Sequence, residues 1–214
     1  MPSKKTTEGT EAVGQSALEV LDLQRVVYTI PVVGTAPLIT QRWSEKARRM
    51  MLDAQQSSTR KKREAKDPEA LFDAARYRLP DDRDGVPATA FKAAIVHAAR
   101  LFDGITQVAL KQAIVVLGDG RDDRGDDLVA IDYGELRMRE DTPRNATGVA
   151  DLRYRPQYWP WSATLRVLTI EGQIKDEASV IRLVNAAGFG GVGEWRPTSP
   201  KSVTGTFGTF EVGS

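Results

Sequence analysis

A glycine-rich segment near the C-terminus carries an arginine and an aromatic residue whose side chains suit contacts with phosphates and bases. It occupies 188–197, between a helical run at 176–187 and a closing strand at 206–212. Glycines reach positive φ angles and let a polyanion come close to the main chain. Arg196 would add a fork of N–H donors, and Trp195 a flat face for stacking. The pattern predicts a backbone cradle for phosphates; a mobile loop that ends the domain is the alternative.

A second segment, at 135–161, interleaves arginines with aromatic residues. The arginines are Arg137, Arg139, Arg144, Arg153 and Arg155, and the rings are Tyr154, Tyr158, Trp159 and Trp161. Guanidinium forks fit phosphate oxygens, and flat rings stack on any base at about 1–3 kcal/mol each. This pattern predicts a nucleic-acid contact. The alternative is that Tyr154, Trp159 and Trp161 belong to the core and that the arginines pair with Glu140, Asp141 and Asp151.

Basic residues also accumulate at 42–66, where three acidic residues accompany them. The basic residues are Arg42, Lys46, Arg48, Arg49, Arg60, Lys61, Lys62, Arg63 and Lys66. Since the formal net charge of the whole chain is only +1, positive charge is concentrated in this segment. Such an arm can order on a nucleic-acid backbone with release of counterions. A solvated helical hairpin explains the same composition equally well.

The residues that could support catalysis form no known pattern. The chain has no cysteine, and its single histidine, His97, lies in a helical pattern near the border of the apolar face. The aspartates at 119–127 do not follow the spacing of a calcium loop and predict a hairpin turn. The glycine run follows a helix, whereas a dinucleotide-binding loop follows a strand. We expect no catalytic activity, no metal and no cofactor; a metal-free nuclease that uses His97 is the enzymatic alternative.

Length and composition indicate a single soluble domain. The chain has 214 residues, enough for one sizeable core, and its 41% hydrophobic content is ordinary for a soluble protein. No apolar run approaches the ~20 residues that span a bilayer. Residues 1–20 predict a disordered tail without the apolar core of a signal peptide. We expect one domain over 21–214, with no membrane contact, in the cytoplasm (the host cytoplasm for a phage protein).

The spacing of apolar residues predicts the elements that must position these segments. Strands are expected at 25–33, 107–117, 128–133, 162–170 and 206–212, and helices at 44–79, 69–75, 87–102 and 176–187. Without insertions the order is strand–helix–strand, twice. This order predicts an α+β fold of the ferredoxin-like (split βαβ) type, with an antiparallel sheet covered by helices on one face. The expected insertions are helical at about 44–80 and a basic, thumb-like loop at about 135–160.

This order, together with the glycine loop at 188–193 and Gly-Thr-Phe-Gly at 205–208, resembles the RAMP superfamily, the RNA-binding subunits of CRISPR effector complexes. The resemblance covers 25–212 loosely and is motif-like only over about the last forty residues. It implies Gly190, Gly191, Gly193 and Arg196 as contacts to the nucleic-acid backbone, and 137–155 as a thumb between neighbouring subunits. No residue matches a nuclease histidine of the family. The composition, and stretches such as 151–156, also resemble phage proteins of similar size.

We therefore expect a non-catalytic protein that binds single-stranded DNA or RNA and forms a homo-oligomer along the strand. Each protomer would cover a few nucleotides. The residues expected to touch them are Arg42, Arg48, Arg49, Arg137, Arg139, Arg144, Arg153, Arg155, Trp159, Gly190, Gly191, Gly193, Trp195 and Arg196. The alternative is a phage structural or protein-interaction component, because arginine and aromatic side chains also mark protein interfaces.

Overall fold

The computed structural model describes residues 22–43, 49, 52, 67–143, 151–200, 202 and 204–213. Over these residues the chain is an α+β protein with eight β-strands in an antiparallel sheet and four α-helices. The predicted α+β class is therefore confirmed. The predicted tail at 1–20 and most of the predicted helical insertion lie outside the described residues.

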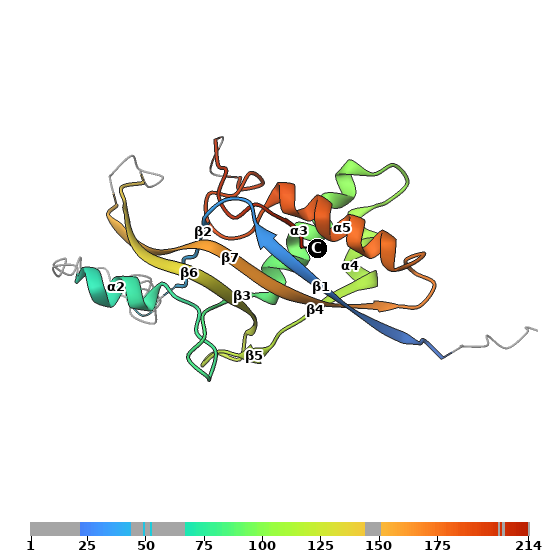
Figure 1. The fold of residues 1–214 in the computed structure, drawn as a ribbon, viewed down its shortest axis with the longest axis horizontal. Coiled ribbons are helices and arrows are strands. Elements are labelled where there is room, and N and C mark those ends of the chain that lie inside the picture. Colours follow the sequence, from blue (N-terminus) through green and yellow to red (C-terminus); the bar gives the residue numbers. More distant parts are fainter. Residues whose placement is uncertain are drawn as a thin grey trace, which may run out of the picture.

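The sheet is built around one long strand, β7 (Arg153–Ile170). The main strand order is β3 (Gly85–Pro87), β6 (Asp127–Asp141), β7, β1 (Arg25–Gly34) and β8 (Phe210–Val212). Beside this path, β2 (Leu38–Ile39) and β4 (Ile114–Leu117) pair with β7, and β5 (Gly120–Arg121) pairs with β6. Strands β6 and β7 stay paired as far as Asp141 and Arg153, so they form a long hairpin that extends away from α3, α4 and α5 (Figure 1).

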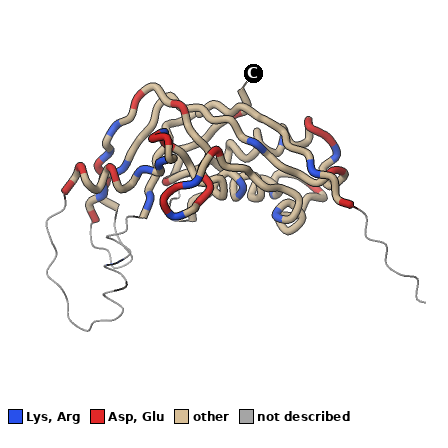
Figure 2. Tube along the Cα trace, turned by 90° about the horizontal axis from the view of Figure 1, so that it is seen from below, with Lys and Arg blue, Asp and Glu red and all other residues tan. Residues whose placement is uncertain are grey.

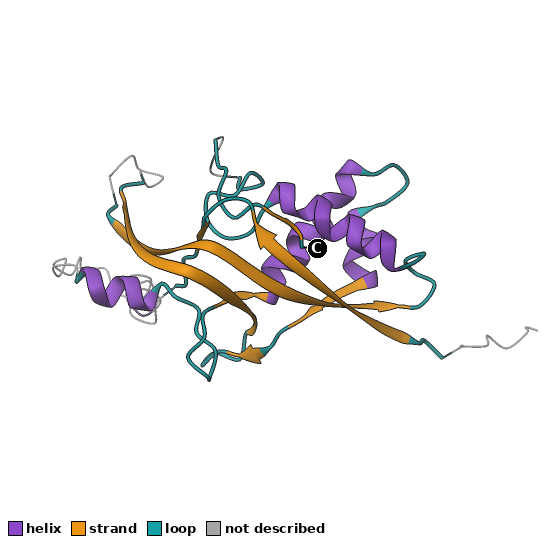
Figure 3. Cartoon of the chain, viewed as in Figure 1, coloured by secondary structure: helices purple, strands orange, loops and turns teal. Residues whose placement is uncertain are grey.

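Three of the four helices in the described residues begin after a residue whose side chain caps the first turn. The four are α2 (Pro68–Ala74), α3 (Ala88–Ala98), α4 (Gln107–Ala113) and α5 (Glu177–Gly190), and a 3-10 turn at Ala99–Leu101 follows α3. The side chains of Asp67, Thr106 and Asp176 accept hydrogen bonds from the first turns of α2, α4 and α5. Helices α3, α4 and α5 gather over one end of the sheet, and α2 lies beside the hairpin (Figure 3).

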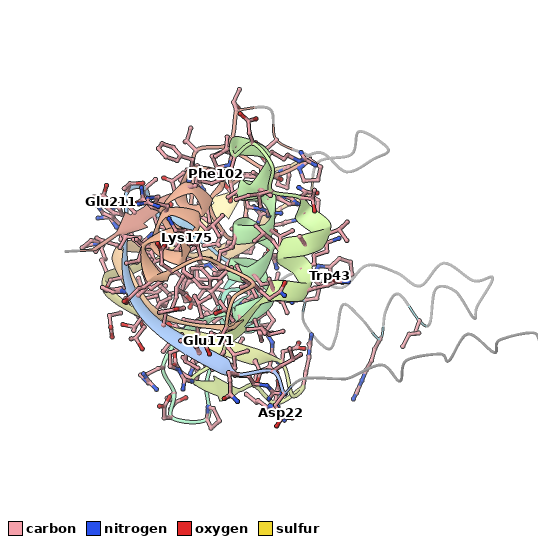
Figure 4. The ribbon with its side chains drawn as sticks, turned by 90° about the vertical axis from the view of Figure 1, so that its right-hand side faces the viewer. Asp22, Trp43, Phe102, Glu171, Lys175 and Glu211 are labelled. Carbon is pink, nitrogen blue, oxygen red and sulfur yellow. The ribbon has the colours of Figure 1, made fainter. Side chains whose placement is uncertain are left out.

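The core lies between α3, α4 and α5 and one face of the sheet. Along β1, Ile30 and Val32 are buried whereas Val27 and Val33 are exposed, the alternation expected of a strand with one covered face. Apolar side chains of α3 and α5, such as Phe91 of α3, join the same buried cluster. In the view along the long axis, side chains fill the space between the helices and the sheet (Figure 4).

Several sequence-based element predictions are confirmed and others are wrong. The strand at 25–33 and the helices at 69–75 and 176–187 are confirmed as β1, α2 and α5. The strand predicted at 107–117 is instead α4 followed by β4, because Leu110 and Ala113 enter the core at helical spacing and Thr106 caps the first turn.

The thumb-like loop predicted at about 135–160 is also wrong over the described residues. Most of this segment is paired strand, with Arg137 opposite Gln157, Met138 opposite Pro156 and Arg139 opposite Arg155. It therefore continues the sheet instead of interrupting it. We call this end of the hairpin, residues 135–141 and 153–159, the hairpin arm.

Candidate nucleic-acid interface

Trp195 joins the two segments that the sequence singled out. The guanidinium carbons of Arg139 and Arg155 each lie 5.1 Å from the centroid of the Trp195 ring. Arg139 also lies 5.0 Å from the ring centroid of Phe207. The two arginines occupy facing positions of β6 and β7. A guanidinium at this distance from an aromatic ring is attracted to its face, by about 0.5–2 kcal/mol. The structure thus brings Arg139, Arg155 and Trp195 together from distant parts of the sequence.

Arg155 supports this arrangement from inside the protein. It is 1% exposed, and its Nε donates to Oε1 of Gln41 at 3.0 Å. Its guanidinium nitrogens lie 3.6 Å from the Asp141 carboxylate and 3.9 Å from that of Glu194. Burial lowers the pKa of Arg155, and the charge of Glu194 opposes that effect. The prediction that Arg155 contacts nucleic acid is therefore wrong, since neighbouring residues cover its side chain.

The other described arginines of the arm pair with acidic side chains close in sequence. Arg137 pairs with Glu135, Arg139 with Asp141, and Arg153 with Asp151. Basic and acidic positions are accordingly interspersed along the arm (Figure 2). The side chain of Arg137 nevertheless remains 66% exposed, so its ion pair is accessible to an incoming anion. Arg144 lies outside the described residues.

The aromatic residues of β7 between 158 and 161 divide between core and surface. Tyr158 and Trp161 are buried, and the Trp161 Nε1–H donates to the Ala36 carbonyl at 2.8 Å. Trp159 is 41% exposed. The core alternative is therefore correct for Trp161 and wrong for Trp159, whose side chain remains accessible for stacking.

The glycine segment is packed against its own protein and does not form the predicted backbone cradle. Gly190 is the last residue of α5. The N–H of Gly191 donates to the Ala187 carbonyl, and the N–H groups of residues 192 and 194 donate to carbonyls of residues 208 and 39. A Cβ on Gly193, whose φ is 78°, would lie 2.4 Å from the Ile39 oxygen. These glycines permit close approach of β2 and residue 208, and the N–H groups of residues 191, 192 and 194 have no capacity left for a phosphate.

A pocket of about 150 Å³ opens between α3 and residues 192–198; we call it the glycine-loop pocket. Its apolar lining includes Val86, Ala90, Ala94 and Val192, and its polar lining includes Thr40, Gln41, Tyr77, His97, Glu194, Arg196 and Thr198. Sequence reasoning assigned Arg196 but missed the pocket. Its residues come from four separated segments, and only the one at 192–198 overlaps a segment that composition singles out, so no sequence signal could have identified the pocket as a whole.

Arg196 gives the pocket a positive character, and His97 lies in the same lining. The Arg196 Nη1 donates to the Gly193 carbonyl at 2.8 Å, and no acidic side chain among the described residues pairs with this guanidinium. Burial, followed by the positive charges of Arg100, Arg196 and Lys111, lowers the pKa of His97. Glu194 also lines the pocket, but its carboxylate lies 3.9 Å from Arg155.

The basic segment predicted from Arg42 onward is described only at its start. Arg42 is engaged in ion pairs with Asp122, at 3.0 Å, and with Asp123, so it fixes the turn before β6. Arg49 is exposed, and Arg48 lies outside the described residues. The Asp122 carboxylate also accepts backbone N–H groups of residues 124 and 126. Among the described residues, no cluster of acidic, histidine or cysteine side chains is arranged to hold a metal ion.

No protein-family model matches the chain, and no curated protein matches its sequence. None of the helices in the described part of the chain is long and apolar enough to cross a membrane.

Proposed function

We propose that this protein binds single-stranded nucleic acid without cleaving it, along the surface where the hairpin arm meets Trp195. We call this the arm surface; it comprises Arg137, Arg139, Trp159 and Trp195. The main observation in support of this proposal is the contact of Arg139, from the arm, with Trp195, from the segment after α5. Alternating cations and rings suit a chain of alternating phosphates and bases.

Strand register supports a continuous surface. Glu135, Arg137 and Arg139 alternate along β6 and lie on one face, opposite Trp159, Gln157 and Arg155 of β7. This face runs from the exposed Trp159 to the ring of Trp195. A base can stack on Trp159, while a phosphate displaces Glu135 from Arg137. Stacking does not distinguish one base from another, so the proposed binding is tolerant of sequence.

A second candidate is a protein-interaction component. The carboxylate partners of Arg137, Arg139 and Arg153 favour it, because paired arginines attract phosphate less strongly. Exposed apolar side chains elsewhere also favour it: Leu101 is 64%, Val108 67% and Phe189 74% exposed. Side chains of this type mark protein interfaces when they form a continuous patch.

The deciding experiment is a titration of fluorescent oligo(dT) and oligo(rU) with the wild-type protein and two tryptophan variants. Trp159→Ala should weaken binding about tenfold, the effect of one lost stacking contact. Trp43→Ala is the matched control, since Trp43 is 59% exposed and lies outside the arm surface. Equal affinity in the two variants, or no binding by the wild type below ~10 μM at low salt, would favour the protein-interaction candidate.

The proposal also includes a ferredoxin-like core of the kind that the RAMP resemblance implies. The order β6, β7, β1, β8 supports it, with α3 between β1 and β6 in the chain and α5 between β7 and β8.

Oligomerisation along the bound nucleic-acid strand is part of the same proposal. Among the described residues, β1 pairs with β7 along most of its length but with β8 only at 32–34, which leaves much of one edge open. Analytical ultracentrifugation with and without oligo(dT) tests the proposed oligomerisation, because the sedimentation coefficient should rise when several protomers bind one oligonucleotide.

A further inference from the structure

We propose that the glycine-loop pocket binds one nucleotide unit, with the base against the apolar side chains of β3 and α3 and the phosphate at Arg196 and His97. This inference rests on the proposed function but concerns a different site from the arm surface. It assigns a ligand class to a pocket whose residues come from four parts of the chain.

The size and apolar lining of the pocket suit one base. An apolar cavity of about 150 Å³ can hold a benzene-sized ring, and a pyrimidine ring is of that size. Val86, Ala90, Ala94 and Val192 provide apolar contact, and Tyr77 adds an aromatic side chain. The Thr40 hydroxyl and the Gln41 amide lie in the same lining, where the hydroxyl donates to the Ala75 carbonyl and the amide oxygen accepts from Arg155. Pockets of this type combine an apolar lining with a few polar groups that fix orientation.

The other part of the lining suits a phosphate. Arg196 presents a guanidinium fork that pairs with no acidic side chain among the described residues. The charged groups that act on His97 are Arg100 from the 3-10 turn, Lys111 from α4 and Arg196, all of them cations. Glu194, the acidic group in the lining, lies beside the guanidinium of Arg155. A phosphate in this pocket would therefore meet an excess of positive charge and a ready pair of N–H donors.

A nucleotide fits this combination better than an inorganic anion or an apolar ligand alone. An inorganic anion would leave the apolar lining unfilled, and an apolar ligand would leave Arg196 without an anionic partner. The nucleotide can belong to a bound strand or be free in solution. The two sources share the same chemistry, and a comparison of mononucleotide with oligonucleotide probes distinguishes them.

The experiment uses the fact that His97 is the only histidine of the chain, so its imidazole gives a single resolved NMR titration. The probes are thymidine 5′-monophosphate, thymidine, inorganic phosphate and oligo(dT). We expect oligo(dT) and the monophosphate to raise the pKa of His97, and thymidine to leave it unchanged. Inorganic phosphate should bind more weakly than the monophosphate, because it lacks the base.

Two variants test the two halves of the pocket. Ala93→Leu places a larger side chain at an exposed helical position of the lining, and Arg196→Ala removes the guanidinium. Each should weaken binding of the monophosphate about tenfold, as the loss of one good contact does. The matched controls are Ala109→Leu, exposed on α4, and Arg182→Ala, on α5; neither residue lines the pocket, and both variants should bind as the wild type does.

The outcomes separate this inference from the proposed function. If oligo(dT) binds, with loss of affinity in Trp159→Ala, but the His97 titration and the pocket variants show no effect, the inference is overturned and the proposed function stands. If the monophosphate raises the His97 pKa while oligo(dT) does not bind, the pocket is a site for free nucleotides and the proposed function fails. If neither probe binds, both are wrong.

Discussion

At the scale of single residues, the carboxylate of Asp84 has no exposure to solvent and accepts three hydrogen bonds. Two come from Arg76, at 2.9 and 2.7 Å, and one from the Tyr133 hydroxyl, at 2.9 Å. The bond to Asp84 raises the pKa of Arg76, against the opposing effect of burial. Breaking a buried ion pair on one side leaves the other charge uncompensated.

We therefore predict that Asp84→Asn lowers the free energy of unfolding by about 3–5 kcal/mol, as the loss of one partner from a buried ion pair does. Urea unfolding followed by tryptophan fluorescence measures this change. Tyr133→Phe, which removes one hydrogen bond to the same carboxylate and keeps the ring, should lower it by only about 1 kcal/mol. Equal effects of the two substitutions would show that the ion pair contributes little.

His97 provides a second prediction at the same scale. Burial and nearby cations lower its pKa in the folded protein below the usual 6.5. The unfolded chain then binds the proton more tightly than the folded one. The contribution of His97 to stability is therefore complete above its unfolded pKa and is lost as the pH falls through 6.5 toward the folded value. The wild type should lose more stability than His97→Gln as the pH falls from about 7.5 to about 5.5, in urea unfolding at each pH. An NMR pKa at or above 6.5 would show that burial and the neighbouring cations do not control this imidazole.

At the scale of elements, glycines of α5 have different roles although they are close in sequence. A Cβ on Gly188 would lie 1.7 Å from the Phe210 carbonyl oxygen, so this glycine lets α5 approach β8. A Cβ on Gly190 would meet a methyl group of the Thr198 side chain at 3.0 Å, and rotation of this side chain can relieve the contact with loss of the hydrogen bond from its hydroxyl to the Gly190 carbonyl. The backbone of Phe210, in contrast, is part of β8 and cannot move away from a side chain at position 188.

Gly188→Ala should therefore lower the unfolding free energy by about 3 kcal/mol or more, as a strong overpacking does. Gly190→Ala should lower it by no more than about 1 kcal/mol, because one side-chain hydrogen bond at most is lost and alanine has the better helix propensity. Thermal unfolding by circular dichroism compares the two variants directly. Similar melting temperatures for both would show that α5 does not need close contact with β8.

The sequence predicts local elements better than their contacts. Periodicity identifies β1 and α5 because each has one face buried against the core. It fails at 107–117, where the same apolar residues suit a strand or a short helix and only the contacts of Leu110 with the core decide. A regular strand would also place Trp159 and Trp161 on one face, yet Trp161 is buried and Trp159 exposed. The carbonyl of Ala36 that binds Trp161 lies in a turn more than a hundred positions away.

The candidate site shows the same limit. Composition identifies Arg139 and Trp195 as residues with suitable chemistry, and the structure places them in contact. Composition cannot reveal that Arg155 is buried, because its coverage depends on Gln41 and on Glu194 from distant segments. The glycine segment misleads for a related reason, since a glycine that admits a phosphate and one that admits a neighbouring strand look alike in sequence.

At the scale of the whole molecule, long-range attraction of a polyanion is weak. The formal net charge is +1, and basic and acidic positions are interspersed along the described chain (Figure 2). Binding must therefore come from a few local contacts. For a single strand, the logarithm of the binding constant falls with the logarithm of salt concentration at a slope of about −0.7 for each phosphate neutralised. Arg137 and Arg196 can each contact a phosphate without separation from a buried carboxylate, whereas Arg139 pairs with the buried Asp141. With these two phosphate contacts, we expect a slope of about −1.4 for the whole protein.

Arg137→Ala should reduce the magnitude of this slope by about 0.7 and weaken binding to all base sequences alike. The measurement is a series of oligo(dT) titrations between low and moderate salt. Arg83→Ala is the matched control: Arg83 also pairs with an acidic residue two positions away, and its side chain is 51% exposed, but it lies outside the arm surface. Its removal lowers the net charge by the same amount, so any effect of overall charge appears equally in both variants. A slope that changes equally in the two would mean that the whole molecule, and not the arm, attracts the strand.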